Sequence, residues 1–181
     1  MNVQEATTRR LPDLKERHLP ENCRETINTI LKETYGYEQF RNLEIYDDLS
    51  KGKEKLCISQ GQLIENVILE AEKAWKGETQ VDNILLTAPT GSGKSLLFQL
   101  PAIYLGKEYN LLTIVVSPLK ALIVDQVESL QELGYTRVAY ASSDLSPEQK
   151  MEVYRQVREG EIDLFYLSPE LLLSYDIKHF V

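Results

Sequence analysis

The sequence predicts an α/β fold, in which a parallel sheet is covered by helices on both faces. Short apolar runs, typical of buried strands, occur at residues 84–86, 112–116, 138–141 and 164–167. Segments of helical periodicity lie between these runs, and a glycine-rich turn separates the first run from the helix after it. Strands that alternate with helices are joined by right-handed crossovers, which place helices on both faces of the sheet.

The predicted helices follow from apolar periodicity and from the residues at their ends. Their expected ranges are residues 61–75, 93–105, 120–133 and 147–159. Apolar residues line one face of the first helix, and Gly77 ends it. Ser146 is the expected N-cap of the last helix, with Glu148 and Gln149 near its first turn.

The first part of the chain differs from the rest, because it is polar and charged. Helical periodicity covers residues 23–33, so we expect residues 1–55 to form a mainly helical accessory segment. Residues 50–53 read as a turn or linker, which places the α/β domain at residues 56–181.

Composition limits the classes of function. The 28 acidic and 20 basic residues give a net charge of −8, so any contact with nucleic acid has to be local. No apolar stretch approaches the roughly 20 residues that span a bilayer, and the start of the chain has no signal core. We therefore expect a cytoplasmic protein, or a nuclear one in a eukaryote, without a membrane partner. Cys23 and Cys57 are too far apart to indicate a disulfide framework or a zinc site.

A phosphate-binding loop lies between the first apolar run and the helix that follows it. Its residues are Ala88, Pro89, Thr90, Gly91, Ser92, Gly93, Lys94 and Ser95. The usual pattern is G-x-x-x-x-G-K-[ST], and here a small residue, Ala88, takes the first place.

The residue types in this loop suit ATP and Mg²⁺. Gly91 and Gly93 let the backbone curl so that successive N–H groups face phosphate oxygens, and the helix N-terminus adds its dipole. Lys94 can reach the β and γ phosphates, and we expect it to act in catalysis as well as in binding. Ser95 offers a hydroxyl to Mg²⁺.

The blocks after the loop resemble the RecQ branch of the superfamily 2 helicases. They run in order from about residue 84 to residue 172 and occupy residues 97–102, 113–127, 130–134, 142–143 and 160–171. The resemblance implies a RecA-like ATP-binding domain of an ATP-dependent helicase or translocase that acts on nucleic acid, with DNA preferred over RNA.

The resemblance also implies where nucleic acid binds. Two strand-to-helix corners are expected along its path, formed by Ser117, Pro118, Leu119 and Lys120 and by Ser168, Pro169 and Glu170. Such corners lie at the sheet edge where ligands bind in open α/β folds. Two alternatives stay open: Pro118 ends a strand beside a solvated Lys120, and Glu170 caps the helix that follows it.

In this family a glutamine before the phosphate loop recognises adenine. Gln60 and Gln62 are the candidates, and we favour Gln62 because Gly-Gln before an apolar helix resembles the family pattern. Residues 35–41 resemble the segment that enters this region, so an insertion would separate the two fragments. The alternative is that both are ordinary surface glutamines at a helix start.

Hydrolysis needs an acidic pair, normally Asp-Glu after a later strand, and no such pair follows a predicted strand here. We therefore expect the chain to be an N-terminal piece of a protein that carries a second RecA-like domain in cis. Alone, it should bind nucleotide without turning it over. Two other functions stay open: a P-loop ATPase that acts as a switch or remodeller without strand separation, and an interaction fragment that docks a partner through its N-terminal segment.

Overall fold

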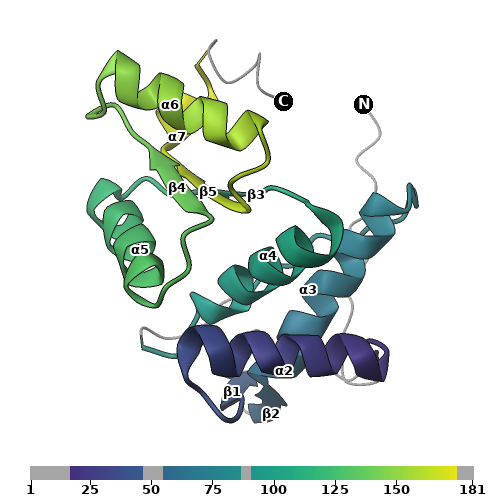
Figure 1. Cartoon of the computed structure of the whole chain (residues 1–181). Coiled ribbons are helices and arrows are strands. Elements are labelled where there is room, and N and C mark those ends of the chain that lie inside the picture. Colours follow the sequence, from purple (N-terminus) through teal and green to yellow (C-terminus); the bar gives the residue numbers. More distant parts are fainter. Residues whose placement is uncertain (1–16, 47–54, 87–90, 175–181) are drawn as a thin grey trace. The chain divides into compact units, whose positions relative to one another are not determined.

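The structure is a computed structural model of the whole chain, and it describes residues 17–46, 55–86 and 91–174 (Figure 1). The chain forms two compact units. One consists of Met1–Leu31 and Tyr37–Pro101, and the other of Lys32–Gly36 and Ala102–Val181. The helix α2 (Glu21–Tyr35) covers the predicted helical segment and buries Ile27, Ile30 and Leu31.

A β-hairpin that the sequence reading did not predict follows α2. Strands β1 (Asn42–Tyr46) and β2 (Lys55–Ser59) pair antiparallel, from Asn42 opposite Ser59 to Tyr46 opposite Lys55. Both strands are short, and they lack the two-residue turn that marks a hairpin in a sequence. The turn predicted at residues 50–53 lies outside the described residues. The domain division at residue 55 stays a prediction.

The helix α3 (Gln60–Trp75) begins directly after β2 and matches the predicted helix closely. The Ser59 side chain caps it by accepting a hydrogen bond from the Gly61 N–H. Gly77 has a φ of 78°, which suits the residue that ends a helix and agrees with the prediction.

Glu70 ties α3 to the segment that leads to the phosphate loop. This buried carboxylate accepts the Asp82 N–H at 2.9 Å and pairs with Arg17 at 2.7 Å and Lys73 at 3.1 Å. Burial raises the pKa of Glu70, but the hydrogen bonds from Asp82, Arg17 and Lys73 outweigh it, and the net pKa is lowered. Glu70 therefore stays charged and anchors this segment.

The strand predicted at residues 84–86 is wrong. Residues 81–86 have no regular secondary structure, and Leu85 is 92% exposed. A strand requires a neighbouring strand for its backbone hydrogen bonds. Among the described residues, the two sheets consist of β1 and β2 and of the three later strands, and neither sheet includes residues 84–86. An apolar run alone therefore did not make a strand here.

The helix after the loop, α4 (Leu96–Tyr109), begins at Leu96 rather than residue 93 and continues beyond residue 105. Gly93 has a φ of 77°, which a right-handed helix cannot accommodate. At the other end Asn110 takes a φ of 52° and its N–H donates to the Gly106 carbonyl. Asn110 thereby stops the helix in the way that glycine usually does.

A three-stranded parallel sheet forms the core of the second unit. Its strands β3 (Thr113–Val116), β4 (Val138–Ala141) and β5 (Leu164–Leu167) confirm three of the predicted strands. Their order is β3-β5-β4, and the register aligns Val116, Leu167 and Ala141 at the carboxyl ends. All four residues of central β5 are buried, as expected for a parallel strand that is covered on both faces.

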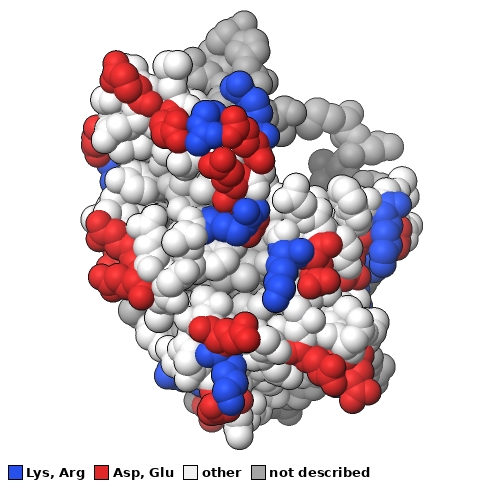
Figure 2. Space-filling view, in the orientation of Figure 1, with Lys and Arg blue, Asp and Glu red and all other residues white. Residues whose placement is uncertain are grey.

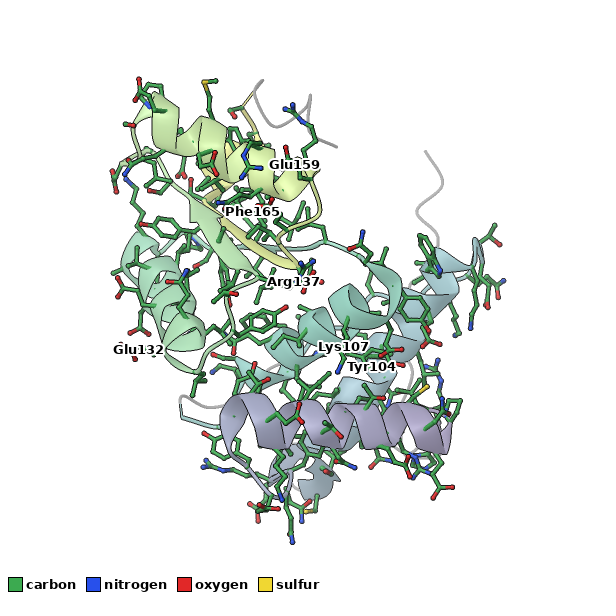
Figure 3. The ribbon with its side chains drawn as sticks, in the orientation of Figure 1. Tyr104, Lys107, Glu132, Arg137, Glu159 and Phe165 are labelled. Carbon is green, nitrogen blue, oxygen red and sulfur yellow. The ribbon has the colours of Figure 1, made fainter. Side chains whose placement is uncertain are left out.

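Helices α5 (Lys120–Glu132) and α6 (Pro147–Arg158) lie on opposite sides of this sheet, and the short α7 (Pro169–Leu172) follows β5 (Figure 1). The ring of Tyr154 on α6 meets Phe165 of β5 edge-on, at 6.4 Å between centroids. Figure 3 labels Phe165 next to α6. Ser146 and Gln149 form a capping box at the start of α6, which confirms the predicted N-cap. The three-layer α/β arrangement therefore agrees with the predicted fold class.

Two further expectations from the sequence concern membrane-spanning helices and the two cysteines. Within residues 17–46, 55–86 and 91–174, no helix is long and apolar enough to cross a membrane. Cys23 and Cys57 are free thiols. In the same part of the chain, no group of three or more His, Cys, Asp or Glu residues could hold a metal ion.

Candidate nucleotide and nucleic-acid sites

The described part of the phosphate loop, residues 91–95, is curled at the start of α4. Gly91 and Gly93 have φ values of 79° and 77°, which glycine adopts readily and other residues rarely do. The first hydrogen bond of the helix runs from the Leu96 N–H to the Gly93 carbonyl, at 3.2 Å. The amides of residues 91–95 therefore precede the hydrogen-bonded helix, where the N-terminus of a helix binds anions. Ala88, Pro89 and Thr90 lie outside the described residues.

Three side chains in the loop fit a nucleotide with a magnesium ion. Lys94 is exposed, and Ser95 is partly buried at the helix start. Among the residues that the structure describes, the Ser92 Oγ is a buried polar atom without a hydrogen-bond partner, and a bound ligand or water is one way to satisfy such a group. Mg²⁺ in phosphate sites keeps several waters and needs only one or two protein ligands, so a single hydroxyl suits it.

Gln60 contacts the loop directly. Its side-chain Nε2 donates to the Ser92 carbonyl at 3.1 Å and to the Gly93 carbonyl at 3.4 Å. Its Oε1 accepts the Arg41 N–H at 3.1 Å. The residue is 2% exposed, so this contact is part of the core around the loop.

The two sequence fragments that resemble the adenine-recognition region come together at Phe40 and Arg41 on one side and Gln60 and Gly61 on the other. Phe40 packs so closely on Gly61 that a Cβ at Gly61 would come within 2.6 Å of its ring. The Gln60 N–H donates to the Arg41 carbonyl at 2.9 Å. The hairpin of β1 and β2 therefore connects the two fragments and brings their ends into contact, and that it is an insertion stays a prediction.

Gln62, which the sequence favoured for adenine recognition, lies one residue beyond Gly61 on α3 and is partly buried. Its backbone carbonyl accepts the Asn66 side-chain amide at 2.8 Å. Gln60 contacts residues 92 and 93 of the loop. No signal in the sequence indicated this contact, because the hairpin that aims Gln60 was not predicted.

A second group of predicted residues lies at the carboxyl ends of the parallel strands. Ser117 follows β3 and Ser168 follows β5, and the Ser117 N–H donates to the Leu167 carbonyl at 3.0 Å. The Leu119 N–H donates to the Ser117 Oγ at 3.3 Å, which turns the chain into α5. Both predicted corners, residues 117–120 and 168–170, thus share one edge of the sheet, with exposed Pro118 and partly buried Pro169 in their turns.

A third corner, after β4, joins this edge and was missing from the predicted site. The Lys120 Nζ donates to the Ser143 Oγ at 2.5 Å and to the Asp144 carboxylate at 2.8 Å. The hydrogen bond from Lys120 lowers the pKa of Asp144. The signal that could have identified Ser143 and Asp144 is their position directly after a predicted parallel strand.

Glu170 is exposed in the first turn of α7. Hydrogen bonds from its own backbone N–H and from the Ser168 side chain lower the pKa of Glu170, and Lys120 contributes a weaker electrostatic attraction. These contacts agree with a capping role at the helix start.

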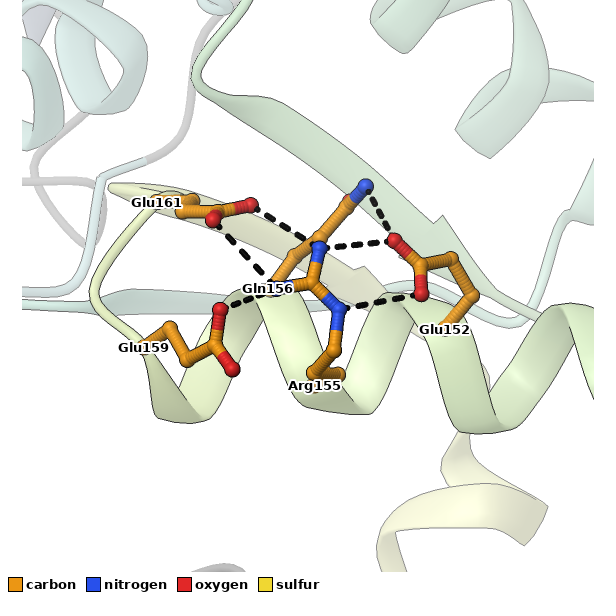
Figure 4. Close-up of polar contacts among 5 residues, drawn as sticks. All are labelled: Glu152, Arg155, Gln156, Glu159 and Glu161. Carbon is orange, nitrogen blue, oxygen red and sulfur yellow. Dashed lines mark hydrogen bonds and ion pairs between the residues drawn. The ribbon is translucent and has the colours of Figure 1, made fainter.

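Charge elsewhere on the second unit is balanced or acidic. Figure 2 shows basic side chains interspersed with acidic ones on the face in view. On α6, Arg155 pairs with the carboxylates of Glu152, Glu159 and Glu161 (Figure 4). In this cluster three carboxylates surround one guanidinium, so the cluster does not favour a phosphate backbone.

Comparisons with known proteins agree with this arrangement. The family model of the DEAD/DEAH box helicases matches residues 60–180. The chain is 34% identical over 151 residues to "ATP-dependent DNA helicase RecQ" of Synechocystis, covering 83% of this chain and 25% of that protein. It is 32% identical over 148 residues to the RecQ protein of Bacillus subtilis, covering 82% of this chain and 20% of that protein. It is 32% identical to "ATP-dependent DNA helicase Q-like 5" of Arabidopsis thaliana over 84% of this chain and 13% of that protein.

A solved structure shows the same fold. The crystal structure of the DUF1998 helicase MrfA bound to DNA matches with a TM-score of 0.55 and 22% identity, over 90% of this chain and 19% of that one. The chain thus spans a quarter or less of these proteins. A family model that covers residues 60–180, with RecQ-like motifs in order along it, shows that the chain belongs to the DEAD/DEAH box helicase family.

Proposed function

We propose that this chain is the ATP-binding portion of an ATP-dependent DNA helicase with RecQ-like motifs. The observation that carries the proposal is the loop of residues 91–95, curled by two glycines of positive φ at the start of α4. In a chain of this family, that loop is where a nucleoside triphosphate binds.

Within the loop, the proposed roles follow from chemistry. Lys94 places a positive charge at the β and γ phosphates, and the backbone amides of residues 91–95 bind phosphate oxygens. Ser95 holds Mg²⁺ through its hydroxyl, and Gln62 recognises adenine. A bound Mg²⁺ neutralises charge on the phosphates.

The carboxyl edge of the sheet is the proposed contact with DNA. Ser117 and Lys120 supply a hydroxyl and an ammonium to the phosphate backbone, with neighbouring amides. Ser168 is 2% exposed and contributes through the position that it gives its corner. Pro118, Leu119, Pro169 and Glu170 shape the corners. Contacts with phosphate position a protein without reading sequence, which suits a protein that moves along a strand.

Hydrolysis is proposed to require more than this chain. A second RecA-like domain in the same protein would complete the site around ATP, as the family resemblance implies. The chain alone is expected to show no DNA-stimulated steady-state ATP turnover. An ATPase assay checks this, and turnover by the chain alone would contradict this part of the proposal.

The binding of Mg²⁺ and ATP tests the nucleotide site. Lys94→Ala should weaken ATP affinity at least about tenfold, because it removes a charge-assisted hydrogen bond. Lys107→Ala is the matched control, since Lys107 is an exposed lysine in the last turn of the same helix. Isothermal titration calorimetry measures the ATP affinity of both variants and of the wild type. Equal affinity in the Lys94 variant and the wild type would rule out the assigned loop.

A further inference from the structure

We propose that Gln60 is a positioning residue that holds the phosphate loop in its binding conformation before nucleotide arrives. This inference rests on the proposed function, because it concerns the same loop. It assigns to Gln60 a role separate from the adenine recognition proposed for Gln62.

The contacts of Gln60 connect the loop to the base of the hairpin. Its Nε2 reaches the Ser92 and Gly93 carbonyls at 3.1 and 3.4 Å, and its Oε1 accepts the Arg41 N–H at 3.1 Å. When these carbonyls are held on the side of Gln60, the peptide groups of the loop have a fixed orientation. The N–H groups, which point away from the carbonyls of their own peptide groups, are then preorganised for an anion.

The hairpin explains why the side chain is aimed this way. Arg41 and Gln60 continue the register that pairs Asn42 with Ser59, and the Gln60 N–H makes the expected bond to the Arg41 carbonyl at 2.9 Å. The backbone carbonyl of Gln60 belongs to α3, so the side-chain Oε1 takes its place and accepts the Arg41 N–H. These two hydrogen bonds between Arg41 and Gln60 extend the pairing of β1 and β2 by one residue, and they fix the orientation of the Gln60 side-chain amide.

Only a glutamine amide satisfies every partner at this position. The Arg41 N–H is a donor and requires an acceptor, while the Ser92 and Gly93 carbonyls accept only. A carboxylate would keep the bond to Arg41 and repel both carbonyls. A methionine of similar length would make neither bond.

The close packing of Gly93 on Gln60 also supports this positioning role. A Cβ at Gly93 would lie 2.6 Å from the Gln60 Nε2, so the close approach requires glycine as firmly as the positive φ does. The loop and the glutamine are therefore packed against each other, and a change in one has to move the other.

The test compares Gln60→Met and Gln60→Glu with the wild type for binding of ATP, GTP and inorganic tripolyphosphate, each with Mg²⁺. We expect both variants to bind all three about tenfold more weakly, the effect of about one to two hydrogen bonds. The ratio of ATP to GTP affinity should stay unchanged. Weaker binding in both variants assigns the effect to the loop contacts, because Gln60→Glu keeps the acceptor for Arg41 and Gln60→Met adds no negative charge beside the phosphates.

Gln62→Met is the contrasting variant on the same helix. It should lower ATP affinity relative to GTP and leave tripolyphosphate affinity unchanged. Loss of ATP affinity alone in the Gln60 variants would overturn the proposal, because that result describes adenine recognition. Wild-type affinities in Gln60→Glu would overturn it as well.

Hydrogen–deuterium exchange of the nucleotide-free chain supplies a measurement that needs no ligand. Amides of residues 92–97 should exchange faster in Gln60→Met than in the wild type, while those of α5 and α6 exchange at equal rates and show that the rest of the chain is folded. Unchanged exchange in residues 92–97 would overturn the positioning role. If the wild type binds none of the three ligands, the proposed nucleotide function fails. The exchange experiment still tests whether Gln60 positions residues 92–97.

Discussion

The two edges of the parallel sheet, at the amino and the carboxyl ends of its strands, each carry a pair of opposite charges, and the two pairs differ in the burial of the acidic partner. At the amino ends of β4 and β5, Arg137 pairs with Asp163, and their side chains are 43% and 5% exposed. At the carboxyl ends, Lys120 pairs with Asp144, and their side chains are 45% and 68% exposed. The buried Asp163 carboxylate depends on its protein partners, whereas solvent can replace the exposed Asp144 carboxylate at Lys120.

Hydrogen bonds connect the groups at the amino edge. Asp163 accepts the Tyr135 hydroxyl at 2.6 Å and two Arg137 nitrogens at 2.7 and 2.8 Å. Arg137, which Figure 3 labels, also donates to the Gly160 carbonyl at 2.6 Å. Burial and the bond to Asp163 raise the pKa of Tyr135. A Cβ at Gly106 would come within 2.3 Å of the Asp163 Cγ, so Gly106 and Asp163 pack directly against each other.

At the carboxyl edge the opposite holds. An exposed ion pair contributes at most about 1 kcal/mol, so a phosphate oxygen can replace the Asp144 carboxylate at Lys120 with little loss. Ser117 and Ser168 begin the neighbouring corners, and helix α5 starts at Lys120. The comparison shows which of the two edges keeps an exposed cation with an exposed partner, and this difference is the basis for proposing the carboxyl edge as the DNA contact.

The largest effect on stability is expected at the amino edge. Asp163→Ala should lower the free energy of unfolding by about 3 kcal/mol, because it leaves the Arg137 guanidinium and the Tyr135 hydroxyl without their shared acceptor. Urea unfolding followed by circular dichroism measures the change. Asp144→Ala is the control from the other edge and should leave stability nearly unchanged, because exposed ion pairs contribute little. Equal losses in the two variants would remove the contrast between the edges.

A smaller effect, on binding, is expected from Lys120→Ala. It should weaken single-stranded DNA affinity about three- to tenfold at low salt and reduce the slope of log affinity against log salt by about one phosphate contact. Fluorescence anisotropy at several salt concentrations checks both numbers. Lys107→Ala, at an exposed position in the last turn of α4, serves as the control. An unchanged salt slope would show that Lys120 does not contact phosphate.

The smallest effect is expected from Asp144→Asn. This change frees Lys120 from its carboxylate partner and removes a negative charge from the edge, so DNA affinity should rise about two- to fivefold. The same anisotropy titration detects it, and the increase should disappear in the Lys120→Ala background. A fall in affinity would mean that Asp144 takes part in binding rather than competing for Lys120.

The sequence predicted the regular core well and the irregular contacts poorly, for physical reasons. Strands β4 and β5 and helices α5 and α6 have strong apolar periods and clear caps, so their ranges agree closely with the prediction. Residues 84–86 are just as apolar, but a strand depends on a neighbour that no local pattern reveals. The hairpin of β1 and β2 lacks a turn signature.

The same limit applies to the candidate sites. Gly91, Gly93, Lys94 and Ser95 form a local motif, so spacing alone identified them. The contact from Gln60 to Ser92 and Gly93 spans more than thirty positions in the chain and depends on the hairpin that was not predicted. The pairing of Lys120 with Asp144 spans 24 positions and needed the strand order of the sheet.

Hydrogen–deuterium exchange of the wild-type chain, with and without ligands, tests the central claim most directly. Mg²⁺ and ATP should protect amides of residues 91–99, and single-stranded DNA should protect residues 117–122, 142–145 and 168–172. Residues 135–137 and 160–163 at the amino edge should show no change with either ligand. Protection by DNA at the amino edge, without protection at the carboxyl edge, would contradict the account.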